Sequence, residues 1–116
     1  MQKIAQIDKV TKEIIKVWNS YKEATEFYEV SNTTIYKAVG AKINKESCGS
    51  LWFYYDNIPS KKHITGNRYA LFKSGSFYKL YVSINRIGHD LGLENSEVEK
   101  ILNNEIKHNV YKIKQL

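Results

Sequence analysis

Two stretches of this chain align without a gap when one is shifted by 63 residues. They read YKEATEFYEVSNTTIYKAV at 21–39 and INRIGHDLGLENSEVEKIL at 84–102. Large or apolar residues occupy the same positions in both stretches, and the pairs are Ala24 and Ile87, Tyr28 and Leu91, Val30 and Leu93, and Ile35 and Val98. Lys37 also matches Lys100. This spacing is typical of two short helices joined by a tight turn. The chain is therefore predicted to contain one structural unit twice.

The flanking segments repeat in the same order. A β-hairpin pattern precedes each helix pair, at 4–18 and at 68–82, and Ser74-Gly75 provides the turn of the second hairpin. A short β pattern closes each copy, at 49–55 and at 109–115. Chance could produce a few matching residues, but the same order of elements twice favours a divergent duplication.

Serines stand where each hairpin passes into its helix pair. Ser20 and Ser83 occupy the same place in the two copies and can cap the helix that follows. We expect an α+β fold of two tandem units, each made of a β-hairpin, a helix-turn-helix pair and a closing β-strand. The first unit is predicted to span residues 1–56, and the divergent second copy residues 68–116. Residues 57–67, which contain the only proline, are predicted to form a linker.

The break between the helices requires unusual residues. Gly92 can take the left-handed conformation that the tight turn needs, and Thr25 or Gly88 is small enough for the helices to cross closely. The first copy has Glu29 in place of the turn glycine, which we expect to cost about 1 kcal/mol.

The second helix of the first copy starts with short polar residues, SNTTIYKA at 31–38. Ser31 is predicted to cap this helix and to contact DNA there, because the free N–H groups and the dipole of a helix N-terminus suit a phosphate. Ile35 and Ala38 are predicted to face inward. The outward residues are then Asn32, Thr33, Thr34, Tyr36 and Lys37. Such side chains can hydrogen-bond base edges or contact the phosphate backbone of double-stranded DNA. In an isolated helix they would only solvate a capped terminus, so the DNA interpretation depends on the helix-turn-helix context.

The charge of the chain favours an anionic partner. The net charge is +6, and most of the excess lies in residues 59–116, which hold ten Lys and Arg against five acids. Further phosphate contacts are expected at Lys22, Lys42, Lys61, Lys62, Arg68 and Lys73. The alternative is that these are scattered solubilising residues.

The second copy has a different chemistry at the equivalent helix. Glu94, Glu97 and Glu99 replace Ser31, Thr34 and the tyrosine at 36, and phosphates would repel them. An alternative function is therefore a protein-binding, anti-CRISPR-like inhibitor of a host nucleic-acid enzyme or defence nuclease. A third possibility is that the duplication only builds a stable core or a dimer surface.

The first copy resembles a known family, the nuclease-associated modular DNA-binding domain of the first type (NUMOD), also called the intron-encoded nuclease repeat. The resemblance covers 4–55 well and 68–116 loosely, since the second copy lacks the closing tryptophan and the polar second helix. The residues that match the family's marks are Ser20, Glu23, Ala24, Val30, Ser31, Gly49, Leu51 and Trp52. The resemblance implies a helix-turn-helix module of homing endonucleases and phage proteins, with Asn32–Lys37 as the reading segment. It implies a regulator or the targeting module of a nuclease, encoded by a phage or mobile element.

We find no catalytic pattern. His63, His89 and His108 lack metal-ligand spacing, Cys48 has no nearby histidine, and no glycine-rich phosphate loop is present. We therefore expect a non-enzyme without metal or cofactor. No membrane span and no signal segment are recognisable, and a lone cysteine fits the cytoplasm, so an intracellular protein is predicted.

Overall fold

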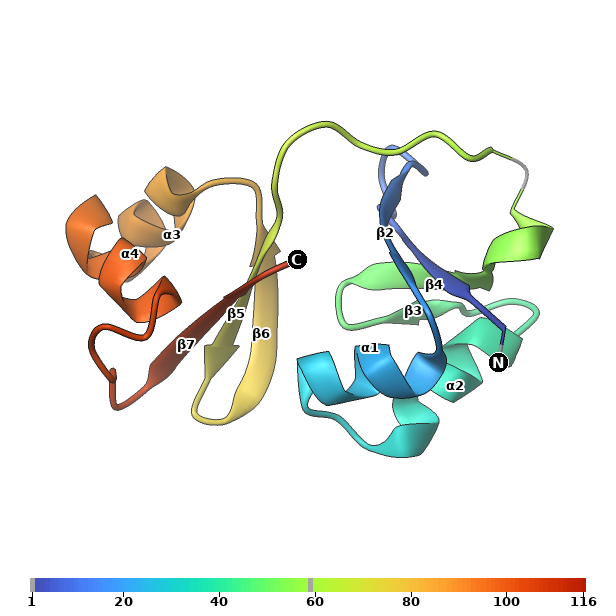
Figure 1. Cartoon of the computed structure of the whole chain (residues 1–116), viewed down its shortest axis with the longest axis horizontal. Helices are drawn as coiled ribbons and strands as arrows, with labels where there is room; N and C mark the ends of the chain where they lie inside the picture. Colours follow the sequence, from blue (N-terminus) through green and yellow to red (C-terminus); the bar gives the residue numbers. More distant parts are fainter. Residues whose placement is uncertain (1, 59) are drawn as a thin grey trace. The chain divides into compact units, whose positions relative to one another are not determined.

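Four α-helices, one 3₁₀ helix and seven strands make up the part of the chain that is described, residues 2–58 and 60–116, in a computed structural model (Figure 1). The strands form two sheets in which every pair is antiparallel, so the α+β class is confirmed. The chain divides into two compact units, Met1–Thr65 and Gly66–Leu116. Among the described residues, no helix has the length and apolar character that a membrane crossing requires.

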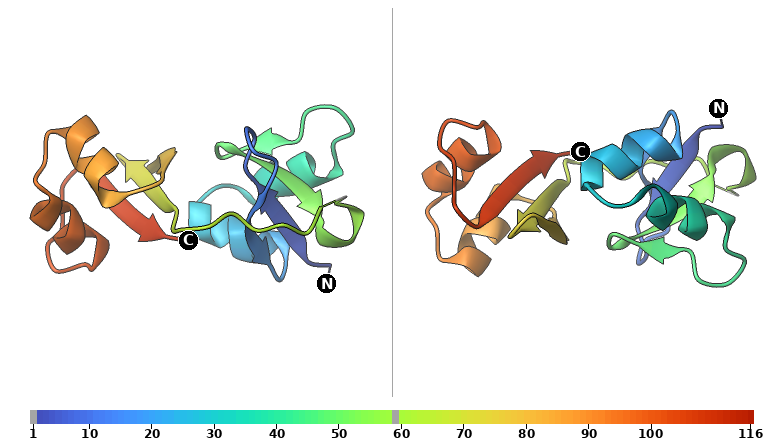
Figure 2. Two further views of the ribbon diagram at one scale, coloured as in Figure 1. Left: turned by 90° about the horizontal axis from the view of Figure 1, so that it is seen from above. Right: turned by 90° about the horizontal axis from the view of Figure 1, so that it is seen from below.

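The first unit is a four-stranded sheet with two helices on one face (Figures 1 and 2). The sheet order is β2-β1-β4-β3. The elements are β1 (Ile4–Ile7), β2 (Ile14–Trp18), α1 (Tyr21–Tyr28), α2 (Asn32–Gly40), β3 (Glu46–Ser47), β4 (Ser50–Tyr54) and the 3₁₀ helix η1 (Tyr55–Asn57).

The second unit repeats this order with one strand fewer. Its sheet order is β6-β5-β7, and its helices also lie on one face of the sheet (Figure 2). Its elements are β5 (Tyr69–Lys73), β6 (Ser76–Tyr81), α3 (Ile84–Leu91), α4 (Asn95–Leu102) and β7 (Tyr111–Gln115). Helix α3 begins and ends 63 residues after α1, as the sequence alignment predicts. In both units the first strand of the hairpin lies between the second strand and the closing strand.

The segment predicted as a linker contributes to the first unit. Ile58 is buried against Ala5, Ile7 and Ile14 on the sheet face away from the helices. The Ile14 N–H donates to the carbonyl of Lys62 at 2.8 Å, and the Ile64 N–H donates to the Ile14 carbonyl at 2.9 Å. The chain around residue 63 is therefore held against β2. Pro59 lies outside the described residues.

A buried polar network fixes helix α1 of the first unit on its sheet. The amide nitrogen of Gln6 donates to the Tyr28 hydroxyl at 2.6 Å and to Ser50 Oγ at 2.9 Å. The Trp18 indole N–H donates to the amide oxygen of Gln6 at 3.1 Å. Gln6, Tyr28 and Ser50 are fully buried, and each bond joins a different element to β1. A buried amide with these partners is satisfied, whereas an unmade bond would leave the desolvation cost uncompensated.

The helices of each pair meet at a left-handed residue, as predicted. Glu29 has φ 55° and Gly92 has φ 69°. In the second unit a Cβ on Gly88 would lie 2.7 Å from the carbonyl oxygen of Leu93, which is in the turn between the helices, so a glycine is needed where the turn passes close to α3. At the equivalent place Thr25 is buried, and its hydroxyl donates to the Tyr21 carbonyl at 2.7 Å.

Replacement of Glu29 measures the cost of that conformation. Glu29→Ala and Glu29→Gly both remove the carboxylate. The difference between their unfolding free energies therefore measures the cost of the left-handed backbone conformation. We expect the glycine variant to be more stable than the alanine variant by about 1 kcal/mol. Urea unfolding followed by tryptophan fluorescence measures this in the first unit, because both tryptophans, Trp18 and Trp52, lie there. Equal stabilities would contradict the assignment of strain to residue 29.

Burial of Tyr28 predicts a loss of stability in alkali. Its pKa is raised well above the ordinary value, mainly because burial disfavours the tyrosinate. Above pH 10 the unfolded chain ionises this tyrosine while the folded unit keeps it neutral, so stability is complete below pH 10 and declines as the pH rises further. Between pH 8 and pH 11, wild type should lose about 1.4 kcal/mol more unfolding free energy than Tyr28→Phe. The same fluorescence assay at the two pH values measures both losses, and equal losses would refute the expectation.

Candidate nucleic-acid interface

Helix α2 has a buried side and an exposed side. Ile35, Ala38 and Val39 are buried in the first unit. The side chains of Asn32, Thr33, Tyr36 and Lys37 are exposed, and Thr34 is half-buried. Apart from the half-buried Thr34, the inward and outward residues that the helical spacing predicts are therefore found on those sides.

Ser31 is the N-cap residue of α2 but does not cap it through its side chain. Its hydroxyl is instead 2.8 Å from Thr34 Oγ1 and 3.4 Å from Thr33 Oγ1. The Thr34 N–H donates to the Ser31 carbonyl at 3.1 Å. The predicted side-chain cap at Ser31 is thus wrong, because its hydroxyl bonds the hydroxyls of Thr33 and Thr34 and not a backbone N–H. Ser20 caps α1 as predicted and accepts from the Glu23 N–H at 3.4 Å.

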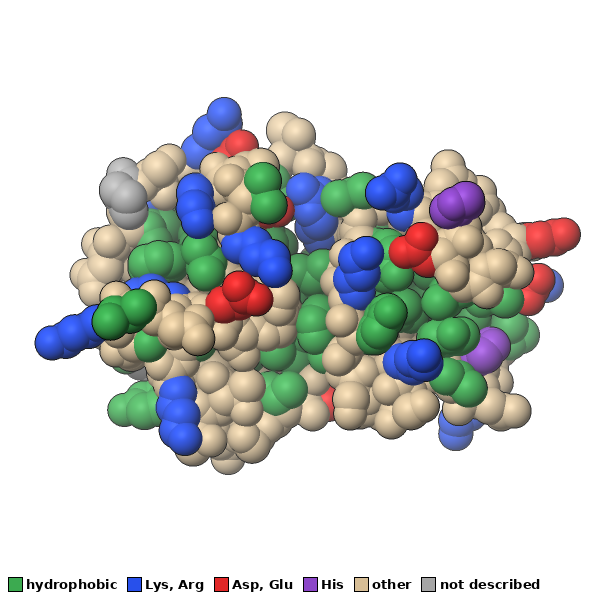
Figure 3. All heavy atoms as spheres, turned by 180° about the vertical axis from the view of Figure 1, so that it is seen from behind, with side chains coloured by type: hydrophobic (Ala, Val, Ile, Leu, Met, Phe, Trp, Pro, Cys, Tyr) green, Lys and Arg blue, Asp and Glu red, His purple; other side chains and the backbone are tan. Residues whose placement is uncertain are grey.

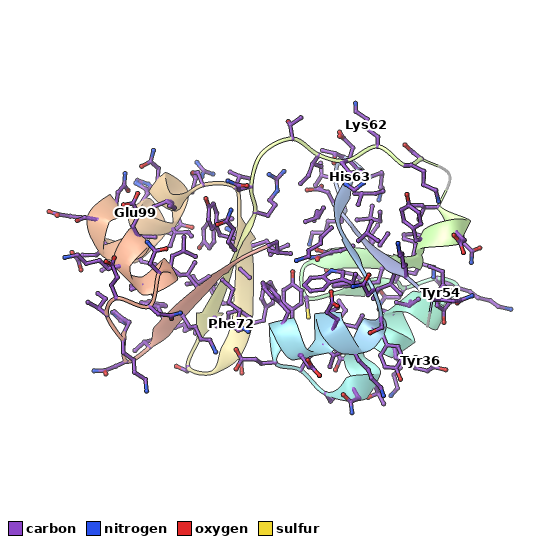
Figure 4. All side chains as sticks on the ribbon, viewed as in Figure 1. Tyr36, Tyr54, Lys62, His63, Phe72 and Glu99 are labelled. Carbon is purple, nitrogen blue, oxygen red and sulfur yellow. The ribbon has the colours of Figure 1, made fainter. Side chains whose placement is uncertain are left out.

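An aromatic hollow adjoins the exposed side of α2. It has a volume of about 220 Å³, and Tyr21, Tyr36 and Tyr54 line it. The rings of Tyr21 and Tyr36 have centroids 5.2 Å apart and planes tilted by 58°. Tyr36 is 52% exposed, and Tyr54 lies on the same side of the unit (Figure 4). Neither Tyr21 nor Tyr54 was predicted from the sequence as a site residue. Because side chains alternate between the two faces of a strand, the spacing in β4 places Tyr54 on the same sheet face as Trp52 and could have indicated it.

A basic segment continues from α2. No acid occurs from residue 30 to residue 45, whereas Lys37, Lys42 and Lys45 do. Lys45 Nζ donates to the Val39 carbonyl at 2.6 Å and lies 4.8 Å from the centroid of the Phe53 ring. Burial lowers the pKa of Lys45. Lys42 and Lys45 line a second hollow of about 450 Å³.

Of the remaining predicted phosphate contacts in the first unit, Lys61 and Lys62 do not lie beside α2. Lys22 is exposed on α1. Lys61 donates to the Tyr55 carbonyl and lies 4.2 Å from the centroid of that ring. Figure 4 shows Lys62 and His63 at the opposite end of the first unit from Tyr36. Lys61 and Lys62 therefore belong to the segment that packs on the far side of the sheet.

Two predicted contacts belong to the second unit. Arg68 Nη1 donates to the Asn67 carbonyl at 3.2 Å. Lys73 Nζ lies 5.6 Å from the centroid of the Tyr78 ring. Basic side chains are visible on both units in Figure 3.

The acidic residues of α4 are all exposed. Glu94 is the N-cap residue, Glu97 lies in the first turn, and Glu99 points outward from the helix (Figure 4). Carboxylates near a helix N-terminus interact favourably with the helix dipole, which is a structural role for the first two. Their exposure leaves them accessible to a basic partner as well.

Potential catalytic groups are dispersed in the described residues. Within these ranges, no three His, Cys, Asp or Glu side chains come together as metal ligands would. Cys48 is half-buried, and burial raises the pKa of its thiol, which disfavours the reactive thiolate.

Comparison of the chain with protein-family models, with curated proteins and with solved structures finds no match.

The different roles of Ser20 and Ser31 can be measured. Ser20→Ala should destabilise the first unit by about 1 kcal/mol because a backbone N–H loses its acceptor. Ser31→Ala should cost clearly less, since only exposed hydroxyls lose a partner. Urea unfolding by tryptophan fluorescence compares the two variants. A loss at Ser31 as large as that at Ser20 would mean that Ser31 does cap α2 in solution.

Proposed function

We propose that the chain is a non-enzymatic protein that binds double-stranded DNA through helix α2 of the first unit. The observation that carries the proposal is the exposed side of α2. Asn32 and Thr33 offer hydrogen-bonding groups at the start of the helix, and Tyr36 and Lys37 follow one turn later. The segment from residue 30 to residue 45 contains three lysines and no acid.

Each of these groups has a task in the proposed complex. The amide of Asn32 is suited to base edges in the major groove, and adenine is the base that asparagine pairs with best. Lys37 and Lys42 would neutralise phosphates and release counterions, and Lys22 on the neighbouring helix would extend that contact. Thr33 and Thr34 would bond phosphate oxygens at the helix N-terminus.

The resemblance of residues 4–55 to NUMOD supports the same assignment. By that resemblance the protein would act as a regulator or as the targeting module of a separate nuclease. The exposed carboxylates of α4 support the alternative function, in which Glu94, Glu97 and Glu99 occupy the basic cleft of a nucleic-acid enzyme.

A matched pair of lysines tests the proposal. Lys37 and Lys100 lie in the last turns of α2 and α4, at the same place in the two units, and both are exposed. Lys37→Ala should weaken binding to a random-sequence duplex pool and lower the slope of log K against log salt by about 0.9. Lys100→Ala removes the same charge and should leave the slope unchanged. Fluorescence anisotropy across a salt series measures both.

Two triple variants separate the proposed function from its alternative. Replacing Asn32, Tyr36 and Lys37 by alanine should abolish selection of a preferred site from the pool. Replacing Glu94, Glu97 and Glu99 by glutamine should leave duplex binding intact or strengthen it. Absence of duplex binding by wild type at low salt would overturn the proposal and leave the acidic helix as the surface to study.

A further inference from the structure

Two hollows of the first unit adjoin each other beside α2. Val39 and Tyr54 line both, so the aromatic hollow and the basic hollow lie side by side, and the two together are called the depression. The first hollow presents Tyr21 and Tyr36, and the second presents Lys42 and Lys45. Rings and cations thus follow one another along one surface.

The aromatic hollow is suited to a single flat ring. Its volume of about 220 Å³ lies below the range of pockets for drug-sized ligands. Three tyrosine rings border it, and Ile4 and Val39 form the rest of its apolar lining. Ser20 and Gln2 also line the hollow, and the Ser20 hydroxyl, which accepts from the Glu23 N–H, can still donate to the polar edge of an inserted ring. An amphipathic ring such as a nucleobase matches this combination.

The basic hollow is suited to the backbone attached to that ring. Lys45 is held in place by its bond to the Val39 carbonyl and by the Phe53 ring, while Lys42 is exposed. Asn57 adds a further polar group to the lining. Aromatic platforms next to a positively charged path are the means by which proteins bind single strands without a strict sequence preference.

We propose that this depression binds single-stranded nucleic acid, with one unpaired base stacked among Tyr21, Tyr36 and Tyr54 and the adjoining phosphates at Lys42 and Lys45. A paired base cannot enter, because its ring is stacked inside the duplex. The ligand therefore differs from the duplex of the proposed function, although Tyr36 borders both surfaces.

The test uses two labelled probes, a single-stranded oligodeoxythymidine of about 12 nucleotides and a duplex pool of the same length. Tyr54→Ala and Tyr36→Ala should each weaken binding of the single strand at least about fivefold, as the loss of a stacking platform does. Tyr36→Phe should restore it, since stacking needs the ring and not the hydroxyl. Tyr78→Ala is the matched control, because Tyr78 is also exposed and near a lysine but belongs to the second unit.

The outcomes distinguish this inference from the proposed function. Single-strand binding that depends on Tyr54, with duplex binding unaffected by Tyr54→Ala, supports the inference. Duplex binding without single-strand binding overturns the inference alone, and failure to bind either probe overturns both. If Tyr78→Ala weakens single-strand binding as much as Tyr54→Ala does, the assigned depression is wrong. Tryptophan fluorescence of each variant verifies that the first unit remains folded.

Discussion

The buried amide of Gln6 is the interaction on which the first unit depends. Its three hydrogen bonds connect β1 to α1, to β2 and to β4. Because Tyr28 is the last residue of α1, the bond to its hydroxyl also fixes the point where the chain turns into α2. The exposed side of α2 and the tyrosine hollow therefore depend on this core interaction, together with the buried side of α2 that packs on the sheet. An interior amide can do this only when all of its partners are present, since each unmade bond costs about 1–3 kcal/mol.

The second unit uses the same frame with a different core. Ile4 pairs with Trp18 in the first sheet and Tyr69 pairs with Tyr81 in the second, so Leu71 stands where Gln6 stands. Leu71 is fully buried in an apolar cluster that includes Tyr81, Ile87 and Ile113. A directional network and an apolar cluster thus support the same order of strands and helices. Both units share the same strand pairing and helix caps. These features do not depend on whether the core is a polar network or an apolar cluster, so the same arrangement of elements accommodates both.

Local features of the sequence were sufficient to predict most of the fold. Helical spacing placed both helix pairs, and Ser20 and the left-handed turn at Glu29 were identified because caps and turns depend on a few neighbouring residues. Gln6 gave no such signal, since a polar residue in a hairpin strand ordinarily faces water, and its partners lie up to 44 residues away. The bonds of Ile14 to residues 62 and 64 were equally unpredictable, because they join backbone groups that every residue carries. The tyrosine hollow required three elements to be placed together before it could be recognised.

The contrast between α2 and α4 separates what the fold requires from what a ligand would require. Both helices bury apolar residues at equivalent places, Ile35 and Val98 among them, and both carry a lysine in the last turn. Glu94 and Glu97 interact favourably with the dipole of α4, whereas α2 has no acid in its first turn and forgoes that stabilisation. The stability of the helix does not explain why residues 30–45 contain no acid. A phosphate-binding surface would explain it, because carboxylates repel phosphates. Under the proposed function, the two units therefore share one frame, while only the first unit has a surface that an anion can approach.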